Sequence, residues 1–505
     1  MSTTQPLVSP GQAALDGVIA MVAGLGIGNL VSLVAPGSSP VIAVAARFID
    51  ITPAPLKEWA IATFGTADKA VLIVGAIVVT LGLGALTGLV ARRSMGAGLT
   101  CVAILAAIAI TAAIPNASRE MLWWAPGTAA LTVGAWALPR LFRAHGRPSD
   151  ETGENTGQSR RDWFRLAAAL SGAGIVGAVI GRWPSASHLA SPVALPARTL
   201  TPLPAGIESQ APGLSPFVTP SSSFFRIDTA LGVPNIDVNE WRLDITGMVD
   251  RPYSITWPEL LAMEAIERPV TLECVSNEVG GDLIGSAMWL GVRTSTLLAK
   301  AGVQRGADMV LASSIDNFSV STPLPALLDD RDAMVVYGMN GAALPPEHGF
   351  PVRLLTPGLY GFVGATKWLV TLEVTTFAAK KAYWTTRGWS DHGPIKPSAR
   401  IEVPRRGAKV TAGQVTVGGT AWAHGTGVGT VQVRVDQGPW RDATLGPEAG
   451  VQYWRQWIYR WDALPGDHEL QVRVIDLQGK PQDETVAVPA PDGSSGLHTI
   501  RVAVS

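Results

Sequence analysis

Residues able to do chemistry gather in the second half of the chain. Cys274 ends a short stretch of alternating apolar residues and enters a turn, where a thiolate could meet a metal ion or an electrophile. His348 and Arg353 flank a Gly-Phe-Pro unit in a loop rich in Pro and Gly, and Lys367 follows. Such a loop could clamp a phosphate. Taken singly, these residues are more often a buried cysteine, a surface histidine and solvated cations.

Short strands must position these residues. Residues 183–222 are rich in Pro, Ser and Ala without periodicity, which predicts a linker. From Phe224 the chain turns to short alternating strands with polar turns, and from about Ser398 to Ser505 the pattern is denser. We expect a β-sandwich there. Its clearest strand signals are Gln414–Val417, Thr430–Val435, Trp454–Trp461 and His468–Val474.

The first part of the chain is apolar. Five stretches are long and uncharged enough, counting their flanks, to predict membrane spans. They are Ala13–Ala35, Val71–Val90, Gly96–Ile114, Trp124–Leu138 and Leu166–Ile180. The stretch Val41–Trp59 carries charges, so we expect it to lie outside the membrane or along its surface.

Basic residues set an orientation for these spans. Arg92 and Arg93 join the second and third spans, and a larger cluster between Arg140 and Arg165 joins the fourth and fifth. Placing both clusters in the cytoplasm puts the N-terminus there and sends everything after about residue 182 outside. Ser159–Phe164 (SRRDWF) before the fifth span resembles a twin-arginine export signal. The alternative is ordinary positive charge flanking a span.

Charge and composition argue against one class of function and in favour of another. The 505 residues carry a formal net charge of -1, which gives no support for nucleic-acid binding. Only 16% of residues are charged, as expected for a membrane protein with a sizeable folded domain. Cys101 lies in an apolar run and Cys274 in a polar region, so we expect no disulfide between them.

Taken together, the chemistry-bearing segments resemble the sulfite oxidase family of molybdenum-cofactor enzymes over about residues 215 to 505. The matching motifs are Phe224–Asp228, Thr271–Asn277 with the downstream Trp289-Leu290-Gly291, and the block from Tyr337 to Lys367. The stretch Trp457–His468 is similar to the family's immunoglobulin-like dimerisation domain, and Pro394–Pro404 to the join between the two domains.

The resemblance implies a multi-domain architecture. An all-α transmembrane region of about five helices (1–182) and the linker (183–222) come first. An α+β molybdopterin-binding domain (223–395) and an immunoglobulin-like β-sandwich (396–505) follow.

The resemblance also implies residue roles. Cys274 would be the thiolate ligand of molybdenum in a molybdopterin cofactor. Arg226 and Tyr337 would reach the active site as catalytic residues. Cofactor contacts would come from Phe225, Arg226, Asp228, Cys274, Asn277, Asp316, His348, Arg353, Thr366 and Lys367.

Two departures from the family pattern bear on the substrate. Sulfite-oxidising members carry an arginine about five residues after the cysteine, where this chain has Val279 beside Glu278. Asp228 replaces a histidine of the cofactor loop. Losing a cation beside a new carboxylate disfavours a dianion such as sulfite.

A two-electron reaction needs an electron partner. The seven histidines (145, 188, 348, 392, 424, 468 and 498) lie outside the predicted spans, so we expect no haem in this chain. We expect an external cytochrome or quinone-linked protein instead. We expect a homodimer from the resemblance. Arg441, Arg455 or Arg460 could reach the active site from the C-terminal domain.

The leading hypothesis is a membrane-anchored, extracytoplasmic oxidoreductase that transfers an oxygen atom on a small substrate such as a sulfur compound. The alternative keeps the cofactor and reverses the direction, giving a reductase of sulfoxides or other oxidised small molecules. The dimerisation domain favours the oxidase, and the altered anion pocket favours the reductase. A third hypothesis is a non-enzymatic surface protein with an immunoglobulin-like tip, which would hold no molybdenum.

Overall fold

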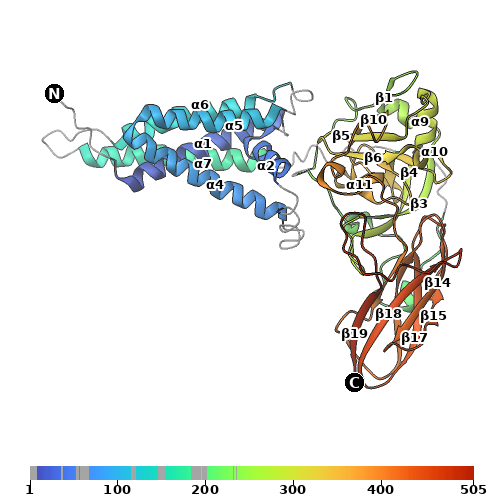
Figure 1. Ribbon diagram of the computed structural model, residues 1–505. Helices are drawn as coiled ribbons and strands as arrows, with labels where there is room; N and C mark the ends of the chain where they lie inside the picture. The colour runs from blue at the N-terminus through green and yellow to red at the C-terminus, as the bar shows by residue number, and fades with distance from the viewer. Residues whose placement is uncertain are drawn as a thin grey trace. The chain divides into compact units, whose positions relative to one another are not determined.

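The computed structural model describes residues 8–35, 38–52, 56, 68–114, 121–145, 155–182, 195, 202–230, 233–234 and 236–505. By its internal contacts the chain divides into a unit of residues 1–191 with 230–232, and a unit of residues 192–229 with 233–505. The first unit is helical, and the second holds the sheets (Figure 1).

Six long helices occupy the described part of the first unit. They are α1 (Pro10–Val31), α2 (Pro40–Ile51), α4 (Asp68–Arg93), α5 (Met95–Ala113), α6 (Ala125–His145) and α7 (Asn155–Arg182). Helix α1 packs against α4, α6 and α7. Glycines make these contacts close, since a Cβ on Gly88 would lie 1.9 Å from the carbonyl oxygen of Ala13. Small residues at helix contacts are typical of helices that associate in a membrane.

Three of the five predicted spans are apolar and long enough to cross a membrane: Pro10–Val34, Val74–Arg93 and Met95–Ala113. The predicted spans Trp124–Leu138 and Leu166–Ile180 lie in α6 and α7, and neither helix is among the spans found within the described residues. Both helices are longer than predicted, and their added ends carry charges: Arg140 and Arg143 in α6, Arg161 and Arg165 in α7. Length and composition thus support three spans among the described residues, and the other two spans stay a prediction.

A buried carboxylate joins three of these helices. Asp16 of α1 is fully buried, and it accepts a hydrogen bond from the indole Nε1–H of Trp163 at 2.8 Å. His145 Nε2 lies 2.9 Å from its other oxygen. Trp163 belongs to the segment that resembles a twin-arginine signal, so this segment is anchored to the bundle on one side. The described part of the stretch 41–59 forms α2, which packs against α5, and its place outside the membrane or along its surface stays a prediction.

Two sheets build the middle of the chain. The first runs β2 (Tyr253–Thr256), β1 (Arg242–Gly247), β10 (Leu369–Thr375), β5 (Met309–Ser314) and β6 (Ser319–Pro323). The second runs β3 (Ile266–Glu273), β4 (Ile284–Arg293), β7 (Met334–Met339) and β8 (Ala342–Ala343), with β9 (Arg353–Leu355) paired to β7. Short helices α8 (Trp257–Leu261), α9 (Thr294–Ala301), α10 (Leu324–Leu328) and α11 (Gly361–Gly364) connect them. This confirms the expected α+β domain.

The core of this domain lies between strands of both sheets. Strands β1, β4, β7 and β10 contribute its buried aliphatic side chains. They include Leu243, Ile245, Leu290, Val292, Val335, Leu372 and Val374. A second cluster, around Trp289, Leu272 and Met339, lies near the Cys274 end of β3. Strand β3, which ends one residue before Cys274, is therefore firmly packed on its buried face.

A β-sandwich follows, as predicted. One sheet contains β11 (Ser398–Val403), β13 (Gly413–Trp422), β17 (Arg455–Ala463) and β16 (Thr444–Leu445). The other contains β12 (Lys409–Val410), β19 (His498–Val504), β18 (Gly466–Asp476), β14 (Val428–Val435) and β15 (Arg441–Asp442). All four strand signals coincide with strands, because alternating residues face the buried interior of the sandwich.

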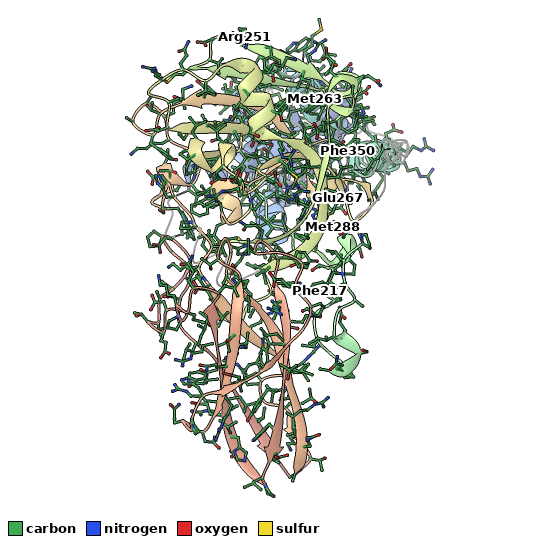
Figure 2. All side chains as sticks on the ribbon, turned by 90° about the vertical axis from the view of Figure 1, so that its right-hand side faces the viewer. Phe217, Arg251, Met263, Glu267, Met288 and Phe350 are labelled. Carbon is green, nitrogen blue, oxygen red and sulfur yellow. The ribbon has the colours of Figure 1, made fainter. Side chains whose placement is uncertain are left out.

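The segment before the first sheet ties the sandwich to the α+β domain. Tyr453 Oη–H and the Trp454 indole N–H both donate to the carbonyl oxygen of Phe217, at 2.7 and 2.9 Å. Figure 2 places Phe217 where the two domains meet. Ala211 and Leu214 are also buried. Part of the stretch with linker composition is thus packed against the sandwich.

The buried His424 should make the chain sensitive to acid. Both imidazole nitrogens are buried, and burial lowers the pKa of His424 from 6.5 to about 4. The unfolded chain therefore binds this proton at higher pH than the folded chain. Stability should fall as the pH drops from 6.5 to 4, by up to about 3 kcal/mol.

Thermal unfolding midpoints of the detergent-solubilised chain, taken near neutral pH and near the lower end of this window, test the effect. His424→Gln should reduce the loss, whereas His392→Gln, at an exposed imidazole, should not. Equal acid sensitivity in both variants would contradict the assignment.

Candidate molybdopterin site

Cys274 stands at the end of β3, in a closed turn. Its backbone N–H donates to the carbonyl oxygen of Leu283 at 2.9 Å, which extends the pairing of β3 with β4. The residue is 9% exposed, and burial raises the pKa of its thiol. A neighbouring positive charge is therefore needed to hold a thiolate here, and a bound metal ion supplies one.

Asn277 closes this turn. Its side-chain N–H donates to Glu273 Oε1 at 2.9 Å, and its Oδ1 accepts from the Leu283 backbone N–H at 2.9 Å. The Asn277 amide thus orients the loop around Cys274. A direct cofactor contact from Asn277 stays a prediction.

Glu273 is a buried acid next to Cys274 that was not among the site residues predicted from the sequence. Burial raises the pKa of Glu273 to about 8, so this carboxyl is largely protonated near neutral pH. The signal in the sequence was an acid at the end of the run Pro269–Glu273, which carries no other charge. Its position, one residue before Cys274, places a proton-holding group beside the thiol.

Backbone pairing brings the two cationic segments together. The Trp368 N–H donates to the Gly349 carbonyl oxygen at 3.3 Å, and the Leu354 N–H donates to that of Thr366 at 2.9 Å. Gly349 has φ 114°, and a Cβ there would lie 3.0 Å from the Cα of Lys367. Glycine is required at this crossing. His348, Arg353 and Lys367 consequently share one neighbourhood.

The Arg353 guanidinium is buried without a carboxylate partner among the described residues. The side chain is 3% exposed, lies over the ring of Trp289 at 5.2 Å, and donates to the His348 carbonyl oxygen at 3.2 Å. Burial lowers the pKa of Arg353 to about 10. A buried cation without a counter-ion costs several kcal/mol, so this position favours a bound anion.

His348 sits beside this cation as a neutral side chain. Its Nε2 lies 2.8 Å from the Ser221 carbonyl oxygen, which assigns the hydrogen to Nε2 and leaves Nδ1 as an acceptor. Burial lowers the pKa of His348. Phe224 packs edge-on against the imidazole at 5.6 Å, which brings the 224–228 segment into the site.

Asp228 is the internal counter-ion of the site. Its Oδ2 accepts from Arg226 Nε at 2.8 Å and from Lys367 Nζ at 3.0 Å. Burial still lowers the pKa of Lys367 to about 8. Burial also raises the pKa of Asp316, and the nearby Asp228 carboxylate adds to that effect. Asp228 thus lies between two of the cations and Asp316 lies near Asp228, whereas a cofactor contact from either aspartate stays a prediction.

The remaining predicted residues lie in two places. Phe225 is half-buried and stacked on Phe224, and Thr366 is fully buried at the backbone crossing. Tyr337 lies in the core of the α+β domain, edge-on to Trp257, and its contact with substrate stays a prediction. Tyr360 is the tyrosine on which the charges of Glu273 and Cys274 act, and together with burial they raise the pKa of its phenol.

A residue of the sandwich also reaches the Cys274 loop. Arg400 of β11 is 7% exposed, and its Nη1 donates to the Gly281 carbonyl oxygen at 2.7 Å. Arg455 instead donates to Gly446 and Val428 within the sandwich, and Arg460 to Thr416. Local sequence does not distinguish these arginines, because the contact is long-range.

The buried polar atoms fit an anionic, hydrogen-bonding cofactor. His348 Nδ1, Arg353 Nε and Thr366 Oγ1 are all buried, and none has a hydrogen-bond partner in the described chain. Buried polar atoms are normally paired, so these mark contacts that a ligand would complete. They lie on the two paired segments that also carry Lys367, whose charge acts on the Cys274 thiol.

Comparison with known proteins decides which cofactor family this is. A family described as oxidoreductase molybdopterin binding domain matches residues 230–384. The mitochondrial sulfite oxidase of Macaca fascicularis is 30% identical over 320 residues, covering 54% of this chain and 58% of that protein. Residues 230–384 therefore form an oxidoreductase molybdopterin-binding domain of the kind found in the sulfite oxidase family.

Other relatives in the family carry different names. The NADH nitrate reductase of Solanum lycopersicum is 27% identical over 319 residues, covering 52% of this chain and 34% of that protein. The sulfane dehydrogenase SoxCD of Paracoccus pantotrophus has 23% identity and a TM-score of 0.49, covering 61% of this chain and 90% of its own. The match spans little more than half the length of the mitochondrial sulfite oxidases.

The lowered pKa of Lys367 predicts a pH-dependent stability of the cofactor-free chain. Between about pH 8 and 10.5 the unfolded chain keeps the proton that folded Lys367 has lost. Stability should therefore rise with pH through this window, by about 2 to 3 kcal/mol. Lys367→Met should flatten that rise.

Chemical unfolding across the same window measures the effect, with Lys381→Met at an exposed position as control. An unchanged slope in Lys367→Met, or an equal change in the control, would show that another group is responsible.

Proposed function

We propose that this chain is a membrane-anchored, extracytoplasmic molybdenum-cofactor oxidoreductase that acts on a small substrate by two-electron oxygen-atom transfer. One observation carries the proposal. Cys274, after the end of β3, lies close enough to Lys367 for that charge to act on its thiol, and the segment of Lys367 pairs with the segment that carries the buried, partnerless polar atoms. The family relationship supplies the cofactor class.

The residues of this chain would hold the cofactor by charge and hydrogen bonds. The Cys274 thiolate would bind molybdenum, and Arg353 and Lys367 would contact the phosphate of the pterin. His348 Nδ1 and Thr366 Oγ1 would take hydrogen bonds from its polar edge. When bound, the cofactor supplies two-electron oxygen-atom exchange.

Asp228 would set how tightly that phosphate is held. Its carboxylate already pairs with Arg226 and Lys367, so an incoming phosphate must compete with it for these cations. Because any incoming anion must displace Asp228, this competition increases the preference for the correct phosphate more than it increases the affinity for that phosphate. Arg226 is the most exposed of the three side chains and can reach toward the substrate side.

The substrate proposal rests on Val279 and Glu278, which stand where sulfite-oxidising members carry a cation. We favour oxidation of a small sulfur compound or similar reductant. Reduction of a sulfoxide or another oxidised small molecule is the second candidate, and the exposed Glu278 carboxylate favours it, because it disfavours a dianion at this loop. Electrons would pass to or from an external cytochrome or quinone-linked protein.

The sandwich and the helices complete the proposal. The two sheets of residues 398–504 would be the family's immunoglobulin-like domain, through which two copies associate. Apolar helices α1, α4 and α5 would anchor the chain, with the N-terminus cytoplasmic. Export of the folded, cofactor-loaded domain through the twin-arginine route would use residues 159–164.

Molybdenum and pterin per chain test the proposal directly. Protein made in a cofactor-competent host and purified in detergent should hold both near one equivalent. Cys274→Ser should lose the visible thiolate-to-molybdenum absorption, because its hydroxyl is a far weaker ligand. Cys101→Ser, in α5, is the matched control and should keep it.

Absence of molybdenum and pterin from the wild type would refute the catalytic proposal. Retention of the absorption in Cys274→Ser would refute the ligand assignment alone. Once the metal is present, assays in both directions distinguish the oxidase from the reductase.

A further inference from the structure

An exposed hairpin of the sandwich reaches the loop that follows Cys274. Residues 483–496, which we call the 483–496 hairpin, lie between β18 and β19. The backbones of Ala487 and Ser495 pair in both directions, at 3.1 and 3.2 Å. Ser495 Oγ–H also donates to the Thr485 carbonyl oxygen at 2.7 Å. The hairpin therefore has a defined shape although most of its residues are exposed.

The first strand of this hairpin presents apolar side chains to solvent. Val486 is 88% exposed, and Val488 is 72% exposed. Residues two apart on an extended strand point to the same side, so the two valines form one patch. Pro489-Ala490-Pro491 follow without a polar side chain. A contiguous apolar patch, unlike a single exposed valine, marks a candidate contact surface.

The second strand of the hairpin is fixed to the α+β domain. The Ser390 backbone N–H donates to the Pro491 carbonyl oxygen at 3.1 Å. Lys396 Nζ donates to the Gly493 carbonyl oxygen at 2.6 Å. Gly493 has φ 97°, and a Cβ there would lie 2.5 Å from Tyr360 Oη, so this close approach requires glycine.

Two hydrogen bonds connect the hairpin to the candidate metal ligand. The Asn277 backbone N–H donates to the Cys274 carbonyl oxygen at 3.0 Å. Ser494 Oγ–H donates to the Asn277 carbonyl oxygen at 2.7 Å. A continuous route of covalent and hydrogen bonds therefore runs from Cys274 through Asn277 to the exposed hairpin. Electrons tunnel more readily along such a route than across a gap of the same length.

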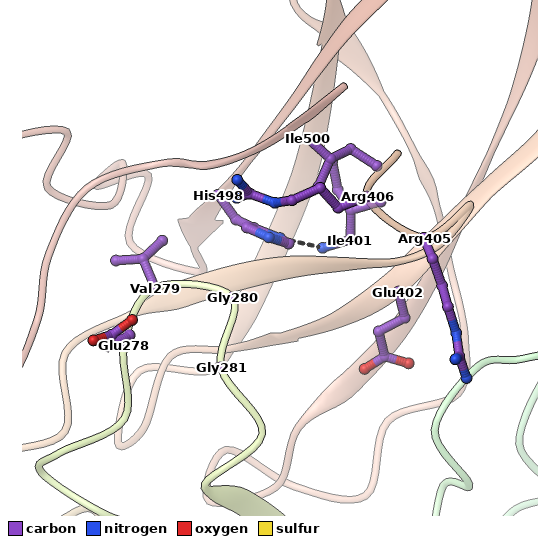
Figure 3. A pocket seen from close by; sticks show the side chains of 10 residues that line it. All are labelled: Glu278, Val279, Gly280, Gly281, Ile401, Glu402, Arg405, Arg406, His498 and Ile500. Atoms are coloured by element: carbon purple, nitrogen blue, oxygen red, sulfur yellow. Dashed lines mark hydrogen bonds between the residues drawn. The ribbon is translucent and has the colours of Figure 1, made fainter. Parts of the chain in front are cut away.

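His498 fixes the chain just after the hairpin against the same loop. Figure 3 shows its imidazole beside Gly280, where a Cβ would lie 2.2 Å from the imidazole Cδ2. Its Nδ1 accepts from the Ile401 backbone N–H at 2.9 Å, the dashed line in Figure 3. The position of the hairpin relative to the Cys274 loop is thus set from both of its ends.

Acidic residues surround the valine patch. The hairpin carries Asp483, Glu484 and Asp492 and no basic residue. Glu484 pairs with Arg473 at 3.0 Å and Asp492 with Lys396 at 3.2 Å, whereas Asp483 is exposed. An apolar centre with a weakly negative rim favours a partner whose own apolar patch is ringed by basic residues.

We propose that the 483–496 hairpin is the docking surface for a one-electron carrier protein, whose redox centre is surrounded by an apolar patch and a basic rim. This inference rests on the proposed function and adds where its electron partner binds. In the oxidation direction, a substrate that gains an oxygen atom from water releases two protons to solvent and two electrons. Each carrier takes one electron, so two carriers dock in succession per turnover. A small, weak contact suits this exchange, because each reduced carrier must leave again.

A second copy of this chain fits the hairpin less well. In a symmetric contact the same patch would lie on both sides, so two acidic segments would face each other and repel. Stable dimers also bury much larger apolar surfaces than two valines provide. A carrier with a basic rim meets neither obstacle.

Calorimetry on the detergent-solubilised full chain tests the docking with mitochondrial cytochrome c, whose haem edge is apolar and ringed by lysines. Binding should lie roughly in the micromolar range. Val486→Ser combined with Val488→Ser should weaken it at least about tenfold, because the apolar contact is lost. Both valines are exposed, so the thermal unfolding midpoint should not change.

Leu464→Ser is the matched control. Leu464 is 71% exposed and precedes β18, whereas the hairpin follows that strand at its other end. This variant should bind cytochrome c like the wild type.

Electron transfer provides a second readout. Holoenzyme reduced with dithionite and freed of excess reductant is mixed with cytochrome c, or with ferricyanide, a small acceptor that needs no docking surface. The double valine variant should reduce subsaturating cytochrome c about tenfold more slowly than the wild type, in line with its weaker binding. It should reduce ferricyanide at the wild-type rate.

The proposal is wrong if the wild type does not bind cytochrome c, if the double variant binds it equally tightly, or if Leu464→Ser loses binding to the same extent. A wild-type dimer that the double variant converts to a monomer in sedimentation would assign the hairpin to a second copy instead. Cys274→Ser, which removes the metal ligand, should bind cytochrome c normally. Calorimetry therefore tests the docking surface even where the molybdenum proposal fails.

Discussion

A buried positive charge without a carboxylate partner governs the architecture of the α+β domain. The Arg353 guanidinium is packed over Trp289 and held by a single carbonyl oxygen, that of His348. Removing it from water is unfavourable unless an anion joins it. The backbone crossing at Gly349, the packing of Phe224 on His348 and the pairing of β7 with β9 all keep this cation in place. The other interactions of the folded domain thus offset the unfavourable burial of Arg353, and a bound anion would remove that cost.

The sandwich has a part in this preparation beyond covering the domain. Arg400 donates to Gly281, and Ser494 Oγ–H donates to the Asn277 carbonyl oxygen at 2.7 Å. His498 packs on Gly280 from the same side. The loop that begins at Cys274 is therefore held by its own Asn277 on one side and by three sandwich residues on the other. Its geometry depends on both domains being folded together.

Local pattern predicts some of this structure well and some of it poorly. Alternation locates strands β13, β14, β17 and β18, because one face of each is buried in the sandwich. The motif around His348, Arg353 and Lys367 is correctly expected to form one cluster. Arg400 could not be selected, since only the tertiary fold brings it to Gly281. Apolar length places all five predicted spans in helices, and three of these helices are long and apolar enough within the described residues to cross a membrane.

The packing of residues 203–217 has a practical consequence for domain boundaries. Composition places this stretch in a flexible tether, but Leu203 and Phe217 pack with Trp454 and Tyr453, and Ile207 accompanies Ala211 and Leu214 against Ile458. Leu195 also packs against the core of the α+β domain, so the tether that can be cut without exposing apolar surface must end before residue 195. A water-soluble form of the two sheet-containing domains would have to begin before residue 195 and keep residues 203–217, which pack against the sandwich.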